Sequence, residues 1–255
     1  MDLGLKGKVA LVAAASQGLG LASALALAAE GARVAICARN EETLTQAAHL
    51  IRSETGVEVF AEPVDVRSGE QLRGFVAAVN LKFGHIDICI ANAGGPPAKP
   101  FRNTTTEDWH AAIEANLMST VALAREVLPG MCDRLWGRFL TITSAAVKQP
   151  IEGLVLSNAV RAAVAGLTKT LANECGPYNV LVNNICPGYT ATARLQSLAG
   201  DKPDVRERWL AQIPLGRFGT PEEFGATVAF LCSEQAGYIT GVSLAVDGGL
   251  VRSLL

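Results

Sequence analysis

The sequence predicts an α/β fold in which helices cover both faces of a parallel sheet. Short apolar runs of strand length alternate with longer segments whose apolar residues recur at helical spacing, a pattern typical of parallel strands joined by helices. A glycine pair, Gly18 and Gly20, separates the first apolar run from the first helical segment. No proline- or serine-rich linker and no block of charge divides the 255 residues, so residues 1–255 are expected to form a single domain.

The composition narrows the possible partners of the chain. Apolar residues make up 49% and charged residues 18%, which supports a sizeable core and leaves apolar surface for contacts between subunits. The net charge of −2 gives no footprint for nucleic acid or an anionic membrane, and no uninterrupted apolar stretch reaches the roughly 18 residues that span a bilayer. Six cysteines without a CxxC pair are typical of reduced core thiols and favour the cytoplasm. His85 and His110 have no partners at metal-ligand spacing, so no metal is expected.

The first half of the chain is expected to alternate four strands with three helices. The predicted strands are 9–12, 34–37, 57–64 and 86–91, and the predicted helices are 19–30, 40–54 and 68–84. Asn40 can cap the second helix, and Ser68 with Gln71 forms a capping-box pattern before the third.

A helix that begins near Thr106 and runs to about Leu128 opens the second half. Strands 139–143, 180–185 and 242–246 follow, with a helix over 156–174 and another that starts at 220–223. Residues 193–214 are polar and irregular in pattern, which indicates a mobile substrate lid at about 190–214.

The glycine corner predicts an anion site. Backbone N–H groups at the start of a helix are unpaired and carry partial positive charge, and glycines let a pyrophosphate approach the backbone. Ala14 stands where a leading glycine is usual, so a plain tight turn is the alternative interpretation. Arg39 follows the second strand and suits the 2′-phosphate of NADP better than the ribose hydroxyls of NAD. The alternative for Arg39 is a solvated surface arginine.

Polar residues follow several other predicted strands. Asp65 and the segment Asn92-Ala93-Gly94 are expected to lie at the same sheet edge as the glycine corner, where Asp65 could accept the adenine amino group. Asn116 lies in an apolar helical face and must therefore be hydrogen-bonded. Ser144 follows the strand 139–143, and Ser157 and Arg161 share one face of the next helix.

These motifs together resemble the short-chain dehydrogenase/reductase family along essentially the whole chain, and its 3-oxoacyl-acyl-carrier-protein reductases in particular. The motifs are residues 13–20, Asp65-Val66, Asn92-Ala93-Gly94, Asn116, Ser144, Pro187-Gly188 and Asp247-Gly248-Gly249. The resemblance implies a doubly wound, seven-stranded parallel Rossmann sheet, a homotetramer, and a nicotinamide beside Ser144 and Pro187-Gly188. The cofactor-binding residues that follow are Ala14, Ser16, Gln17, Gly18, Leu19, Gly20, Arg39, Asp65, Val66, Asn92, Ala93, Gly94, Arg161, Pro187, Gly188, Thr190 and Thr192. Tyr189 and Trp209 are the candidate substrate contacts, with packing as the alternative for Trp209.

The family's catalytic residues are an asparagine, a serine, a tyrosine and a lysine, the last two spaced as YxxxK. Asn116 and Ser144 match the first two. Ser157 stands where the tyrosine belongs, thirteen residues after Ser144, and Arg161 stands where the lysine belongs. An alkyl hydroxyl does not ionise near neutral pH, and an arginine stays protonated and is a poor proton relay.

Three functions are therefore compatible with the sequence. The first is an NADP-dependent oxidoreductase acting on a small carbonyl or alcohol, such as a 3-oxoacyl thioester, in which Ser144 and Arg161 polarise the carbonyl and a water or Tyr189 supplies the proton. The second is a catalytically silent NADP-binding sensor or hetero-oligomer subunit, and the third is a non-redox ligand-binding protein on the same fold. Structural roles stay open for the unusual pair: Ser157 as a helix cap, and Arg161 as an ion-pair partner of Glu114 or Glu152.

Overall fold

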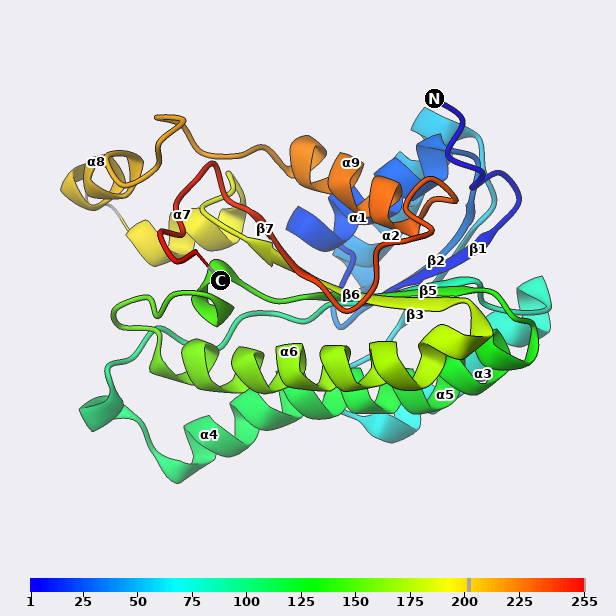
Figure 1. The fold of residues 1–255 in the computed structure, drawn as a ribbon, viewed down its shortest axis with the longest axis horizontal. Coiled ribbons are helices and arrows are strands. Elements are labelled where there is room, and N and C mark those ends of the chain that lie inside the picture. Colours follow the sequence, from blue (N-terminus) through cyan, green and yellow to red (C-terminus); the bar gives the residue numbers. More distant parts are fainter. Residues whose placement is uncertain (201–202, 255) are drawn as a thin grey trace.

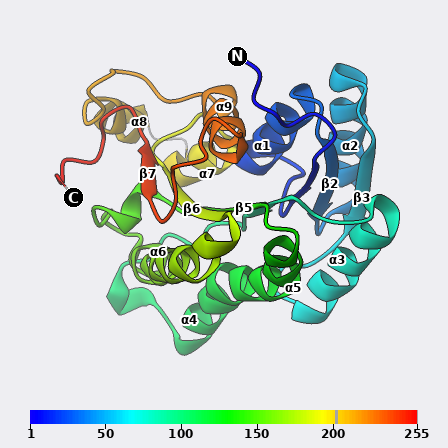
Figure 2. The same cartoon turned by 45° about the vertical axis from the view of Figure 1, so that its right-hand side comes forward.

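The computed structural model describes residues 1–200 and 203–254. Over these residues the chain forms a seven-stranded parallel sheet in the order β3-β2-β1-β4-β5-β6-β7, which confirms the predicted fold class. Figure 2 shows the sheet running from β3 to β7 between two layers of helices. The strands are β1 Val9–Val12, β2 Arg33–Ala38, β3 Val59–Pro63, β4 Ile88–Ala91, β5 Gly137–Ile142, β6 Val180–Pro187 and β7 Ser243–Val246.

Helices cover both faces of the sheet, as expected for a doubly wound fold (Figure 1). One layer holds α1 Gly18–Ala29, α2 Glu41–Thr55 and α9 Pro221–Cys232. The other holds α3 Gly69–Phe83, α4 Thr106–Ala112, α5 Ser119–Asp133 and α6 Val155–Cys175. Short 3₁₀ turns lie at Phe101–Asn103, Ala145–Val147 and Gly176–Tyr178.

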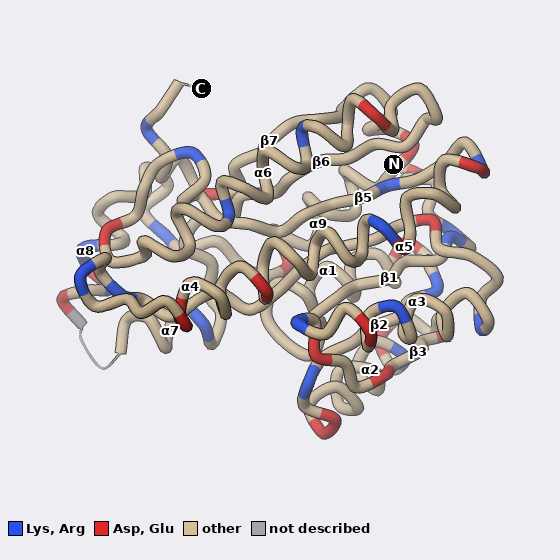
Figure 3. Tube along the Cα trace, turned by 90° about the horizontal axis from the view of Figure 1, so that it is seen from below, with Lys and Arg blue, Asp and Glu red and all other residues tan. Residues whose placement is uncertain are grey.

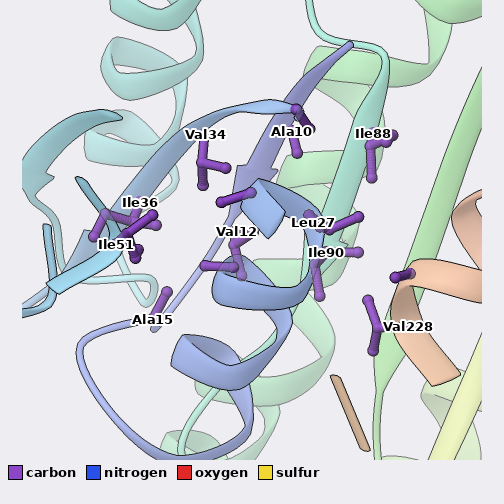
Figure 4. Close-up of a cluster of buried hydrophobic side chains, with 14 of the residues drawn as sticks. Ala10, Val12, Ala15, Leu27, Val34, Ile36, Ile51, Ile88, Ile90 and Val228 are labelled. Atoms are coloured by element: carbon purple, nitrogen blue, oxygen red, sulfur yellow. The ribbon is translucent and has the colours of Figure 1, made fainter. Parts of the chain in front are cut away.

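The core is divided by the sheet because successive strand residues point to opposite faces. Ala10 and Val12 of β1 pack on the α1 side, whereas Val9 and Leu11 pack on the α3 side, and all four are fully buried. Figure 4 shows side chains of β1, β2 and β4 gathered with Leu27 of α1 and Val228 of α9. A strand buried on both faces explains why the first apolar run does not alternate with polar residues.

Two sequence predictions about the second half were wrong in detail. The helix predicted from Thr106 contains a π-helical segment, Ile113–Met118, between α4 and α5, and the apolar spacing did not indicate it because the segment is only one turn or so long. The predicted lid is not irregular: it contains α7 Ala193–Ala199 and α8 Pro203–Leu210, while its residues 201–202 lie outside the described residues. These helices are too short for a clear apolar period and depend on local contacts, such as the Thr192 cap of α7 and the Asp204–Arg208 ion pair of α8.

The carboxyl ends of the strands meet at one edge of the sheet, and α7 and α8 lie beyond that edge (Figure 1). In Figure 3, Lys and Arg are interspersed with Asp and Glu along the helices and loops, so neither sign of charge dominates this view. Among the described helices, none is both long and apolar enough to span a membrane.

Candidate active site

The corner between β1 and α1 is shaped to admit an anion. Ala14 and Gly18 have φ of +48° and +58°, and the Cβ that a larger residue would place on Gly20 would lie 2.5 Å from the Ala14 carbonyl oxygen. Gln17 precedes α1 without capping it through its side chain, so the first N–H groups of α1 have no side-chain acceptor at this position. The corner therefore offers free backbone donors and no side chain that blocks them.

Loops from two other strands meet this corner. The Asn92 amide after β4 donates hydrogen bonds of 3.2 Å to the carbonyls of both Ala13 and Ala14, so its side chain holds the corner in shape. After β6, Thr192 Cγ2 lies 3.7 Å from the position that a Cβ of Gly18 would occupy. Ser16, Leu19, Ala93, Gly94 and Thr190 lie in the same three segments.

Gly188 is required by a close approach between two chain segments. A Cβ on Gly188 would lie 2.6 Å from the Cβ of Asp247. The Asp247 carboxylate in turn accepts hydrogen bonds from the backbone N–H groups of Gly249 and Val251. This contact explains why Pro187-Gly188 and Asp247-Gly248-Gly249 occur together in the sequence. It also fixes the start of the loop that carries Tyr189.

Arg39 and Asp65 lie near one another beyond β2 and β3. Arg39 is exposed, whereas the Asp65 carboxylate forms an ion pair of 2.5 Å with Arg67. Hydrogen bonds from Arg67 lower the pKa of Asp65, and the charge of Arg39 adds to the effect. Val66 is buried beside them. The exposed Arg39 guanidinium is free to meet a phosphate at this edge.

Asn116 lies in the π-helical segment, a kind of distortion that is frequent at functional sites. The side-chain amide of Asn116 donates to the Ala112 carbonyl at 3.2 Å, which confirms that the side chain is hydrogen-bonded. The backbone carbonyl of Asn116 accepts from Thr120 Oγ1 at 2.8 Å. A cavity of about 10 Å³ separates Asn116 from Arg161. That volume is close to the minimum for one water molecule.

Ser144 follows β5, separated from its last residue, Ile142, by Thr143. Its Oγ accepts a hydrogen bond of 3.1 Å from the Ala146 N–H and caps the 3₁₀ turn Ala145–Val147. The side chain is half-buried. The hydroxyl hydrogen of Ser144 thus remains available as a donor to a ligand.

Ser157 and Arg161 are both buried, with 7% and 8% of their surfaces exposed. The residue before α6 is Leu154, so the interpretation of Ser157 as the helix cap was wrong. Arg161 donates from Nη1 to the Thr143 carbonyl, and its Nε has no hydrogen-bond partner. Within the described residues no carboxylate forms an ion pair with Arg161, so pairing with Glu114 or Glu152 was also wrong. Burial, followed by the charge of Arg194, lowers the pKa of Arg161 to about 10, which leaves it protonated at neutral pH.

A pocket of about 430 Å³ opens between α8 and Ala145, the residue after Ser144. Tyr189 and Trp209, the two predicted substrate contacts, both line it, and their rings stack with centroids 4.9 Å apart. Burial raises the pKa of Tyr189. The other lining residues are Ala145, Gln149, Pro150, Ile151, Glu152, Gly153, Val205, Arg208, Gln212, Leu250 and Val251.

Comparison with known proteins identifies the family. Residues 13–251 match the family model described as enoyl-(acyl carrier protein) reductase. The chain is 36% identical over 251 residues to the 3-oxoacyl-acyl-carrier-protein reductase of Aquifex aeolicus, covering 98% of this chain and 100% of that protein. The chain belongs to the short-chain dehydrogenase/reductase family.

Two further relatives of this short-chain dehydrogenase/reductase are informative. The acetoacetyl-CoA reductase of Shinella zoogloeoides is 36% identical, covering 95% of this chain and 98% of that protein. The crystal structure of L-sorbose reductase from Gluconobacter frateurii, complexed with NADPH and L-sorbose, is 35% identical with a TM-score of 0.93 and covers 100% of both chains. The match to the L-sorbose reductase structure thus extends over the whole of the sheet and its helices.

Sequence reasoning missed several residues of this short-chain dehydrogenase/reductase site. Arg194, at the start of α7, donates from Nη2 to the Pro96 carbonyl at 2.6 Å, but no spacing in the sequence connects it to that loop. Residues 149–153 and Leu250-Val251, which follows the Asp-Gly-Gly motif, line the pocket only because the fold brings them there. No group of three or more potential metal ligands gathers in residues 1–200 and 203–254.

Proposed function

We propose that the chain is an NADP-dependent oxidoreductase that interconverts a carbonyl and an alcohol on a small-molecule substrate. The observation that carries the proposal is that the loop after β6 reaches both places: Tyr189 lines the pocket beside Ala145, and Thr192 lies against the glycine corner, which is able to hold a dinucleotide. The relatives support it, since their names describe reductases and one of them was crystallised with NADPH.

The residues of the corner fit a dinucleotide. The side-chain-free cradle at Gly18 and Gly20 suits a pyrophosphate, and Thr192 can donate to it from the β6 loop. Arg39 suits the 2′-phosphate of NADP, while Asp65 is proposed to accept from the adenine. When bound, this cofactor supplies the hydride.

Ser144 and Arg161 are proposed to stabilise charge on the substrate oxygen. Ser144 donates a hydrogen bond to the carbonyl, and the protonated Arg161 behind Thr143 favours a developing negative charge. Within the described residues, the Tyr189 hydroxyl makes no hydrogen bond, and its raised pKa makes it a weak acid. We therefore assign the proton to a water molecule in the small cavity between Asn116 and Arg161 rather than to Tyr189.

A catalytically silent NADP-binding protein is the second candidate. It is favoured by the burial of Arg161 against a backbone carbonyl, because a guanidinium held there has less freedom to contact a cofactor ribose than an extended lysine. The two candidates differ in hydride transfer and not in cofactor binding.

The deciding experiment follows NADPH consumption over a panel of ketones, quinones, oxo acids and 3-oxoacyl thioesters. The native chain is compared with a Ser157→Tyr/Arg161→Lys double variant and with Ser144→Ala. We expect turnover by the native chain, a loss of about 10²-fold or more in Ser144→Ala, and a gain of about 10²–10⁴-fold in the double variant, the range that a general acid contributes. Turnover by the double variant alone would establish the silent protein, and turnover by neither would exclude carbonyl reduction.

Three further features belong to this proposal. Residues 190–214 are proposed as the substrate lid, since Tyr189 precedes them and Trp209 of α8 lines the pocket. A homotetramer is proposed from the family resemblance, to be checked by light scattering. The cytoplasm is proposed as the compartment because all six cysteines are free thiols.

A further inference from the structure

Two guanidinium groups, those of Arg161 and Arg194, lie close to Gly95 in the loop after β4. A Cβ placed on Gly95, which follows β4, would lie 3.4 Å from Arg194 Nε and Nη2 and 3.7 Å from Arg161 Nη2. Arg161 comes from α6 and Arg194 from the lid helix α7, so segments far apart in the sequence bring the two charges together. Because Gly95 has no side chain, no Cβ lies in contact with both guanidinium groups.

Neither guanidinium is compensated by a carboxylate. No ion pair of Arg161 or Arg194 occurs among the residues that the structure describes, and both instead donate to backbone carbonyls, those of Thr143 and Pro96. The Nε of Arg161 is buried without any partner. Two like charges held together, one of them buried, are unfavourable unless an anion joins them.

Arg138, the other deeply buried arginine among the described residues, shows how this chain compensates such a charge when no ligand is needed. Its guanidinium lies 4.3 Å from the ring centroid of Trp136 and 3.6 Å from the Glu234 carboxylate. It also donates to the Ser233 carbonyl. Arg161 has neither the aromatic ring nor the acid.

The position of Arg161 and Arg194 indicates that an anion bound between them would be part of the substrate. Arg161 is bound to the carbonyl of Thr143, the residue directly before Ser144, so an anion at the pair would lie close to a carbonyl group held by Ser144. The free backbone donors for a pyrophosphate are at Gly18 and the start of α1, whereas the two guanidinium groups lie on either side of Gly95 after β4. A planar carboxylate fits two guanidinium forks.

We propose that Arg161 and Arg194 bind the free carboxylate of a short oxo-acid substrate, an inference that rests on the proposed function. Binding would connect the lid helix α7 to α6 across the site. The same site would discriminate against esters and thioesters, in which the carboxylate is masked, because they leave both charges unpaired.

The test is calorimetric titration of the NADPH-loaded protein with acetoacetate and 2-oxobutanoate, and with the methyl ester of each. The variants are Arg194→Met and Arg194→Lys, because Arg194 is partly exposed and its loss leaves the core intact. Arg102→Gln is the matched control, since it removes an exposed positive charge near the same loop. NADPH binding to each variant is titrated separately.

We expect the acids to bind at least about tenfold more tightly than their esters, and Arg194→Met to remove that difference while NADPH binding stays unchanged. Arg194→Lys should retain part of the preference and Arg102→Gln all of it. Equal binding of acids and esters by the native chain would overturn the inference. So would a loss of NADPH affinity in Arg194→Met, which would assign the pair to a cofactor phosphate. A native chain that fails to bind NADPH would contradict the proposed function itself.

Discussion

Ala14 occupies a backbone conformation that favours glycine, with φ of +48°. A Cβ in this left-handed region costs energy that glycine avoids, although glycine loses more conformational entropy on folding. We expect Ala14→Gly to raise the free energy of unfolding by about 0.5–1 kcal/mol, measured by urea denaturation.

The adjacent Ala15 is the control for this substitution. It is fully buried and its φ is not positive, so Ala15→Gly should lower the free energy of unfolding by about 1 kcal/mol or more. The same sign for both variants would show that the strain at Ala14 does not matter for stability.

At the scale of elements, the start of α9 depends on a capping box. Thr220 and Glu223 exchange hydrogen bonds, and Glu223 also binds Arg217 at 2.6 Å. Hydrogen bonds from Arg217 and from the Thr220 N–H lower the pKa of Glu223 from 4.5 to about 2. A carboxyl with a depressed pKa in the folded state stabilises the protein above its unfolded pKa, and this contribution disappears as the pH falls toward 2.

We therefore expect Glu223→Gln to lower the melting temperature at neutral pH and to have progressively less effect below about pH 4.5. Thermal unfolding by circular dichroism between pH 7 and pH 3 checks this. Glu222→Gln, which removes a neighbouring charge outside the capping box, is the control. A pH-independent deficit in Glu223→Gln would indicate lost packing and not lost ionisation.

The elements also show what sequence patterns can and cannot predict. Strands such as β1 and caps such as Asn40 and Thr220 were predicted because they depend on local patterns. The two lid helices were missed because α7 and α8 are short and polar. The identity of the residues at 157 and 161 is plain in the sequence, but the direction of the Arg161 guanidinium depends on contacts with β5 that no local pattern encodes.

At the scale of the whole molecule, one edge of the sheet brings together loops that are far apart in the sequence. The glycine corner, the Asn92 loop and the β6 loop meet because β1, β4 and β6 are parallel strands of one sheet and end at the same edge. Sequence reasoning misses residues that reach such an edge from a helix beyond it, as Arg194 does when it donates to the Pro96 carbonyl.

Cofactor choice can be tested through the stability of the whole chain, because a ligand that binds only the folded state stabilises it. At a concentration 100 times its Kd the gain is about 2.7 kcal/mol, which for a chain of this size corresponds to roughly 5–10 °C in melting temperature. We expect NADPH to give this shift and NADH a smaller one, since Arg39 would meet a 2′-phosphate.

Arg39→Asp should reverse the order of the two shifts by repelling the phosphate and accepting from the ribose hydroxyls. Arg102→Asp, an exposed substitution with the same change in charge, should preserve it. Equal shifts by both cofactors in the native chain would show that Arg39 does not determine the choice.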